Sequence, residues 1–152
     1  MDSNTRRLET SDRMAIDRAK LLEDASRNAV EVVTLWKETV LRMDILEPRG
    51  SKPCAFRLGE DAVHPLAFPR ELLGGLGSLS LVTADESGTT LTLPPRATCE
   101  IIRADGKREP FADIAARRSS FDRGMTPGCV SAVLPAFARA VIDIGPLSFL
   151  VR

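Results

Sequence analysis

The chain of 152 residues has few of the residues that recognise nucleic acids. Tyr is absent, Trp36 is the single tryptophan and there are six Phe, so few aromatic rings can stack on exposed bases. Lys plus Arg and Asp plus Glu are equal at 21 each, so no net positive charge draws the chain to a polyanion or an anionic membrane. We therefore expect no nucleic-acid partner.

Long apolar runs and regularly spaced cysteines are also missing. No stretch approaches the roughly 20 apolar residues that cross a bilayer, and the charged N-terminus, with Asp2 and Arg6, does not resemble a signal peptide. Cys54, Cys99 and Cys129 are an odd set without CxxC spacing, which favours free thiols in a reducing compartment. These absences predict a cytoplasmic protein without membrane insertion, metal or other cofactor.

Catalytic side chains are equally scarce. His64 is the only histidine, so any histidine-based catalysis has to use it. Nothing close in the sequence activates the thiols, and the adjacent acids Glu60 and Asp61 lie in an expected turn, where carboxylates are usually solvated. We expect a non-catalytic protein, with a small enzyme using His64 and a cysteine as an alternative.

Residues 1–28 form a region of their own, with six acidic and six basic residues and neither Pro nor Gly. Ala15, Ala19 and Leu22 recur at helical spacing after Ser11, a good N-cap residue. The sequence predicts an N-terminal α-helix in this charged arm and a separate domain over residues 29–152. The stripe is mostly alanine, so we expect weak packing on the protein's own domain, while a homo-oligomer through the helix stays open.

After residue 28 the hydrophobic period changes to two, which is typical of β-strands. Val30–Trp36 is rich in β-branched residues, Lys37-Glu38 is expected to turn, and Leu41, Met43 and Ile45 then alternate with charged residues. This pattern predicts a hairpin with one buried face. Further strands are expected at Cys54–Leu58, Val63–Phe68, Ser78–Thr83, Thr89–Leu93, Thr98–Arg103, Val130–Leu134, Ala138–Ile144 and Leu147–Val151.

Turn residues separate these short runs, and the whole pattern indicates a mainly β protein. We predict a β-sandwich of about ten or eleven short antiparallel strands preceded by the N-terminal α-helix. Two interruptions are expected: a helical turn at Pro69–Leu73 ended by Gly74, and a polar loop from Ala112 to Gly128 that holds one short helix.

Three segments of the β region resemble forkhead-associated (FHA) domains, which are β-sandwiches. Cys54–Gly59 is similar to the strand before the family's Gly-Arg turn, and Gly145–Val151 to its closing strand. Val32–Leu41 is similar to the first hairpin of divergent FHA-like modules in bacterial gliding-motility and TonB-like energy-transducer proteins. The resemblance covers residues 30–152 and implies a rigid sandwich that docks a protein segment through loops at one end.

The chain departs from the phosphothreonine-binding motifs of that family. Glu60 follows Gly59 where phosphothreonine-binding members place an arginine, and the family's Ser-Arg-x-x-His run has no counterpart between Arg70 and Ser80. Loss of the arginine removes a bidentate phosphate donor, and an acid in its place repels the phosphate. We therefore expect binding that does not depend on phosphate.

Together these features predict a non-catalytic interaction or scaffold module with a protein or peptide partner. The loops Glu60–Ala62, Pro69–Gly77 and Arg117–Arg123 are the expected docking surface. The alternative is a phosphothreonine-peptide reader with altered geometry, in which arginines of these loops or of the strand before them clamp the phosphate. The candidate binding residues are Arg57, Glu60, Asp61, Arg70, Arg117, Arg118 and Arg123.

Overall fold

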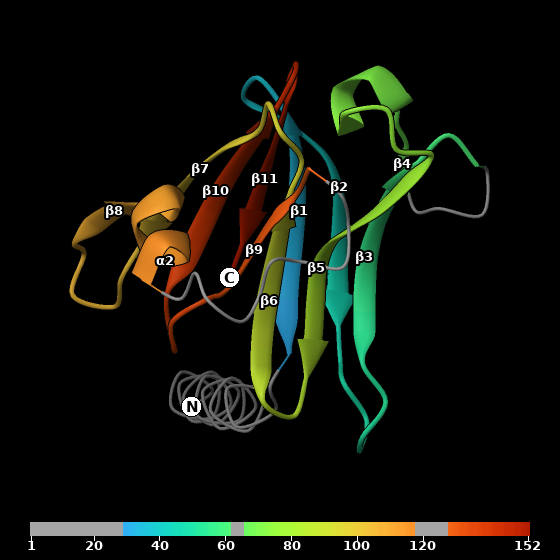
Figure 1. The fold of residues 1–152 in the computed structure, drawn as a ribbon. Helices are drawn as coiled ribbons and strands as arrows, with labels where there is room; N and C mark the ends of the chain where they lie inside the picture. Colours follow the sequence, from blue (N-terminus) through green and yellow to red (C-terminus); the bar gives the residue numbers. More distant parts are fainter. Residues whose placement is uncertain (1–28, 62–65, 118–127) are drawn as a thin grey trace, which may run out of the picture.

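The computed structural model describes residues 29–61, 66–117 and 128–152, which form two β-sheets (Figure 1). The six-stranded sheet contains, from edge to edge, β2 (Thr39–Leu46), β1 (Val30–Trp36), β11 (Leu147–Val151), β10 (Arg139–Ile144), β7 (Thr98–Ile102) and β8 (Arg108–Pro110). The five-stranded sheet contains β4 (Leu66–Ala67), β3 (Cys54–Gly59), β5 (Ser78–Asp85), β6 (Gly88–Leu93) and β9 (Val130–Val133).

The prediction of a mainly β protein is confirmed. Neighbouring strands pair antiparallel except β3 and β4, which are parallel, with Leu58 opposite Leu66. The expected strand over Val63–Phe68 is described only at Leu66–Ala67, and residues 62–65 lie outside the described part. The charged arm of residues 1–28 and its predicted helix also lie outside the described residues.

The two sheets pack against each other through apolar side chains from both. Phe56 of β3 and Phe149 of β11 meet with ring centroids 5.9 Å apart, and both side chains are buried. Leu81 and Leu91 of the five-stranded sheet and Ile142 of the six-stranded sheet belong to the same core. The apolar surface that is buried between the two sheets stabilises the domain.

Two short helical segments lie beside the sheets. The 3-10 turn η1 (Arg70–Leu73) ends at Gly74, whose φ of 69° is the left-handed conformation typical of a glycine C-cap. The helix α2 (Phe111–Arg117) buries Phe111 and Ile114 and contacts β7, β8 and β9 (Figure 1). Both segments were expected, whereas β8 was not, because three residues that include two charged ones carry no recognisable alternation.

The hairpin of β1 and β2 forms as expected around Lys37-Glu38, but the prediction that its apolar face is buried is wrong for β2. Leu41, Met43 and Ile45 are 51%, 56% and 62% exposed. Their charged neighbours Arg42 and Asp44 lie opposite Thr34 and Val32, which face the core. The alternation is therefore present, with the apolar side turned away from the other sheet.

Candidate functional site

The outward apolar side of the β1–β2 hairpin continues as a row across the six-stranded sheet. Met43 pairs with Val33 of β1, Val33 pairs with Leu150 of β11, and Leu150 pairs with Val141 of β10. Directly paired residues project from the same face of a sheet, so these four side chains form one apolar row. Val33 is only 5% exposed yet is not part of the inter-sheet core, as its outward position requires.

Neighbouring pairs widen this row at the edge strand. Leu35 pairs with Val40, and Ile45 pairs with Glu31, on the same outer side. We call the surface formed by Leu35, Val40, Met43 and Ile45, together with the largely buried Val33 that pairs with Met43, the hairpin face. Single exposed apolar side chains are normal on protein surfaces, but contiguous ones are informative, because such patches usually mark interaction sites.

One sequence signal points to this face. β1 is apolar on both sides, with Val32 directed into the core and Val33 and Leu35 directed outward. A half-buried strand normally alternates between apolar and polar residues. Apolar residues on both sides of Val30–Trp36 therefore indicate a second contact surface. A search for alternation between apolar and polar residues does not reveal this signal.

The inner side of β2 carries a paired charge at Arg42 and Asp44, next to the core residue Leu46. The Arg42 guanidinium donates two hydrogen bonds to the Asp44 carboxylate, from Nε at 2.7 Å and from Nη2 at 2.8 Å. These hydrogen bonds raise the pKa of Arg42. The edge strand therefore presents a neutralised ion pair on one side and apolar side chains on the other.

The predicted loop residues Glu60 and Arg70 come together, but with each other. Arg70 donates to the Glu60 carboxylate from Nε at 3.0 Å and from its backbone amide at 3.2 Å. The hydrogen bonds from Arg70 hold the pKa of Glu60 below its ordinary value, and the same contact raises the pKa of Arg70. Asp61 is exposed beside this pair.

The predicted loop residue Arg117, at the end of α2, is likewise paired with an acid. The Glu109 carboxylate, 11% exposed, accepts two hydrogen bonds from Arg103 and also forms an ion pair with Arg117. Arg57 lies exposed on β3 with no acidic partner among the described residues, far along the chain from that cluster. Arg118 and Arg123 lie outside the described residues.

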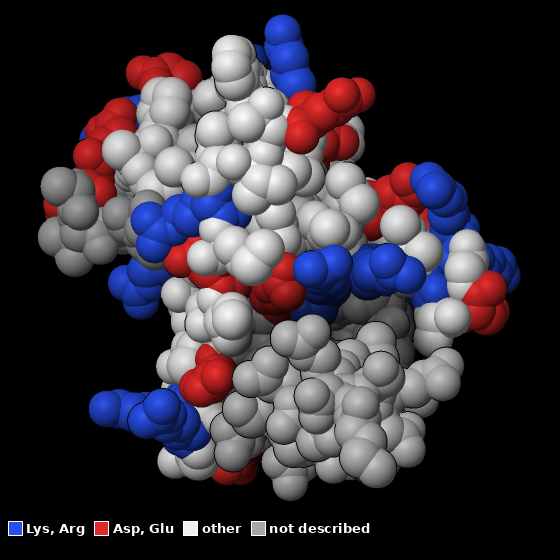
Figure 2. Space-filling model, turned by 180° about the vertical axis from the view of Figure 1, so that it is seen from behind, with Lys and Arg blue, Asp and Glu red and all other residues white. Residues whose placement is uncertain are grey.

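Charges of both signs are mixed over the molecular surface. In Figure 2 basic and acidic side chains lie side by side in a band across the face shown, and neither sign forms a continuous patch there. Together with the Glu60–Arg70 and Glu109–Arg117 pairs, this mixing leaves little positive potential to hold a phosphate.

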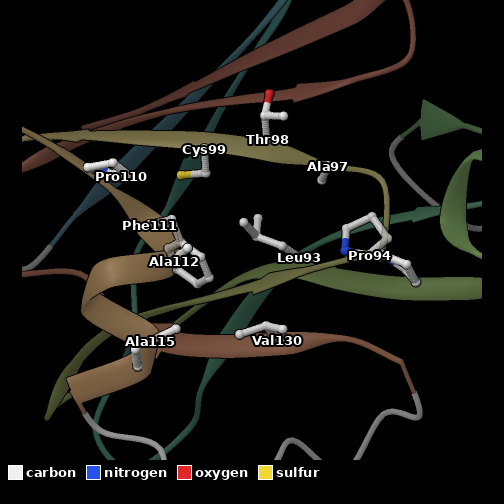
Figure 3. A pocket seen from close by; sticks show the side chains of 12 residues that line it. Leu93, Pro94, Ala97, Thr98, Cys99, Pro110, Phe111, Ala112, Ala115 and Val130 are labelled. Atoms are coloured by element: carbon white, nitrogen blue, oxygen red, sulfur yellow. The ribbon is translucent and has the colours of Figure 1, made fainter.

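An apolar cavity of about 610 Å³ lies between α2 and the adjoining ends of β6, β7 and β9. Figure 3 shows the Cys99 thiol on one side of this space and Ala115 and Val130 on the other. Burial raises the pKa of Cys99 to about 12 and also raises the pKa of Cys129. Both thiols are therefore protonated near neutral pH and are poor nucleophiles.

The cysteines and His64 are the residues of the alternative enzyme hypothesis, and the structure describes only the cysteines. Cys54, Cys99 and Cys129 are free thiols, and Cys54 donates a hydrogen bond to the Glu47 carbonyl oxygen at 3.1 Å. His64 lies outside the described residues. Within residues 29–61, 66–117 and 128–152, no group of three His, Cys, Asp or Glu side chains is placed to hold a metal ion. No helix in these ranges has the length and hydropathy to cross a membrane.

Comparison with known proteins gives no relative to guide the assignment. No protein-family model, no curated protein and no solved structure matches the chain.

Proposed function

We propose that this chain is a non-catalytic protein-interaction or scaffold module that docks its partner through the hairpin face. The observation that carries the proposal is the exposure of Val40, Met43 and Ile45, at 56%, 56% and 62%, on one side of an edge strand. Complete burial of a fully exposed side chain of this kind contributes about 1.5–3 kcal/mol, and these side chains, already partly covered, contribute roughly half of that each. A partner that buries this strip therefore gains a substantial apolar contact.

The local charge pairing supports a partner recognised without phosphate. Arg70 and Arg117 each bind a carboxylate of the same domain, so a phosphate competes with Glu60 or Glu109 for either guanidinium. Arg57 is the described candidate arginine without such a pair, and a phosphothreonine-peptide reader centred on it is the alternative. The FHA-like interpretation belongs to the same proposal, supported by the two packed sheets and by the hairpin at its expected place.

The thiols support a non-catalytic role. Cys99 and Cys129 have pKa values raised by burial, so an enzyme that uses a thiolate nucleophile is disfavoured at either position. A cytoplasmic location follows from the unpaired cysteines and remains part of the proposal.

Paired lysine substitutions test the docking surface. Met43→Lys with Ile45→Lys places two charges on the hairpin face, whereas Val130→Lys with Phe137→Lys places two charges at apolar residues exposed by 50% and 87% elsewhere. A protein captured from native cells is purified, and its Kd is measured for the wild type and both double variants. We expect the first variant to weaken binding tenfold or more, about 1.4 kcal/mol, and the second to leave it unchanged.

Phosphatase treatment of the captured partner is the second arm of this experiment. We expect an unchanged Kd, because the docking contacts are apolar. Loss of binding after treatment, or equal Kd values for the two double variants, would contradict the proposed surface.

A further inference from the structure

We propose that the partner of the hairpin face is a second copy of this chain, which adds its own β2 antiparallel to β2 and joins the two six-stranded sheets into one. This inference rests on the proposed function, because it names the partner of the same surface. It draws on three independent features of β2: the direction of its backbone groups, the exposure of the edge, and the order of charges along the strand.

Among the described residues, no backbone hydrogen bond is made at the outer edge of β2 by Met43 or Ile45. Glu31 of β1 exchanges both of its backbone hydrogen bonds with Arg152 next to β11, at 2.8 and 3.0 Å. Backbone groups of a strand point alternately to its two sides, so Val33 also bonds toward β11. Met43 and Ile45, which lie opposite Val33 and Glu31, therefore direct their amide and carbonyl groups away from β1.

β2 is also the longest of the four edge strands in the described sheets. It spans eight residues, compared with three for β8, two for β4 and four for β9. Its residues Thr39–Met43 are all exposed. A long, exposed and apolar edge is a template for another strand, and many proteins shorten or cover such edges.

The order of charges along β2 favours an axis at Met43 over axes at the two neighbouring residues for a symmetric pair. If the two-fold axis passes through Met43, then Met43 faces Met43 of the second copy, and Arg42 faces Asp44 of the second copy. An axis at Arg42 places two arginines opposite each other, and an axis at Asp44 places two aspartates opposite each other. Directly opposed like charges destabilise a strand pair, whereas opposite charges stabilise it.

The same register uses the outward backbone groups and the apolar side chains together. Met43 and Met43 of the second copy become a hydrogen-bonded pair, and Ile45 comes to face Leu41 of the second copy. The apolar rows of both copies then meet end to end across the new junction, in an isologous interface. Pairing through β2 therefore covers exposed apolar surface in both copies. It also gives the outward backbone groups of each copy hydrogen-bond partners in the other.

Charge reversal tests this register in the full-length chain. Arg42→Asp places aspartates at residues 42 and 44, and Asp44→Arg places arginines at both, so each variant opposes like charges in its own homodimer. We expect the wild type to sediment as a dimer at roughly 100 µM, where a complex with a micromolar Kd is almost fully formed. Each single variant is expected to dimerise at least tenfold more weakly, and their equimolar mixture to recover a heterodimer.

Proline at the centre of the strand supplies a second test. Met43→Pro removes an amide that faces the open edge, where proline is tolerated, while Met43→Ala keeps that amide. Circular dichroism checks that both variants fold, and sedimentation gives their mass. We expect Met43→Pro to be a monomer and Met43→Ala to retain dimer.

The outcomes separate this inference from the proposed function. A wild-type monomer at this concentration overturns β2 pairing, while a captured partner that still depends on Met43 and Ile45 keeps the hairpin face as a docking surface. A dimer that survives Met43→Pro, with no heterodimer from the charge variants, also overturns the inference and directs attention to another interface.

Discussion

Thr34 is a buried polar side chain within an apolar core. It is fully buried on β1, and its hydroxyl has no hydrogen-bond partner among the described residues. A register shift in the β1–β2 pairing falls directly after it, between Thr34 and Leu35. The residue therefore combines a local irregularity in strand pairing with an unpaired polar atom, and the unpaired hydroxyl reduces the stability of the fold.

Thr34→Val is expected to raise the free energy of unfolding by about 1 kcal/mol, because the shape is kept and an unpaired buried hydroxyl is removed. Thr92→Val is the matched control: the Thr92 hydroxyl lies 2.8 Å from that of Ser131, and its loss leaves Ser131 unpaired. Chemical denaturation measures both variants. Equal changes of the same sign would contradict the assignment of an unpaired hydroxyl at Thr34.

At this scale the sequence supplied candidate residues but not their contacts. Glu60 and Arg70 were both candidates for binding a partner, yet each satisfies the other across ten residues of chain. Likewise, Arg117 meets Glu109, which the alternation pattern did not place in a strand. Such ion pairs form only when the fold brings residues of different segments close together. Local sequence patterns contain no information about these distances in space.

At the level of secondary-structure elements, short strands and tight turns were predictable because their signals are local. Alternating apolar residues and turn-forming glycines located β1, β3, β5 to β7 and β9 to β11 within a few residues. The direction of the apolar side of β2 was not predictable, because period-two alternation is unchanged when a strand presents either face to the core. The strand β8 was missed because three residues are too few to show a period.

The β10–β11 turn depends on a glycine with little space around it. Gly145 has a φ of 55°, and a Cβ added there would lie 3.0 Å from both terminal methyl groups of Leu72. Gly145→Ala is expected to lower the free energy of unfolding by about 1–2 kcal/mol from the left-handed backbone alone, with a further loss from the contact.

Gly106→Ala is the matched control for this turn. Gly106 has a φ of 84°, and a Cβ added there would meet no atom within 4 Å, so this variant reports the backbone term alone. Thermal or chemical denaturation of both variants gives the difference. Equal losses at the two glycines would show that Leu72 contributes nothing at Gly145.

For the whole molecule, Phe149 connects the layers. Its ring lies against Phe56 and Phe68, with centroid distances of 5.9 and 6.4 Å, and it is fully buried. Phe149→Ala is expected to lower the free energy of unfolding by about 3–5 kcal/mol. The variant should still unfold in one transition, because both sheets share this core.

Phe137→Ala, at a side chain 87% exposed, is the control and should change stability little. Circular dichroism and Trp36 fluorescence should give the same midpoint, and separate transitions would contradict a shared core.

The position of β11 between β1 and β10 affects how the protein is made. β1 bonds to a strand whose residues follow it by more than a hundred positions, as the Glu31–Arg152 pair illustrates with a separation of 121. At ordinary translation speeds the ribosome needs on the order of ten seconds to supply that strand. Throughout this interval nascent β1 can pair with β2 but lacks its second neighbour, β11, so one edge of the emerging hairpin stays open until synthesis ends.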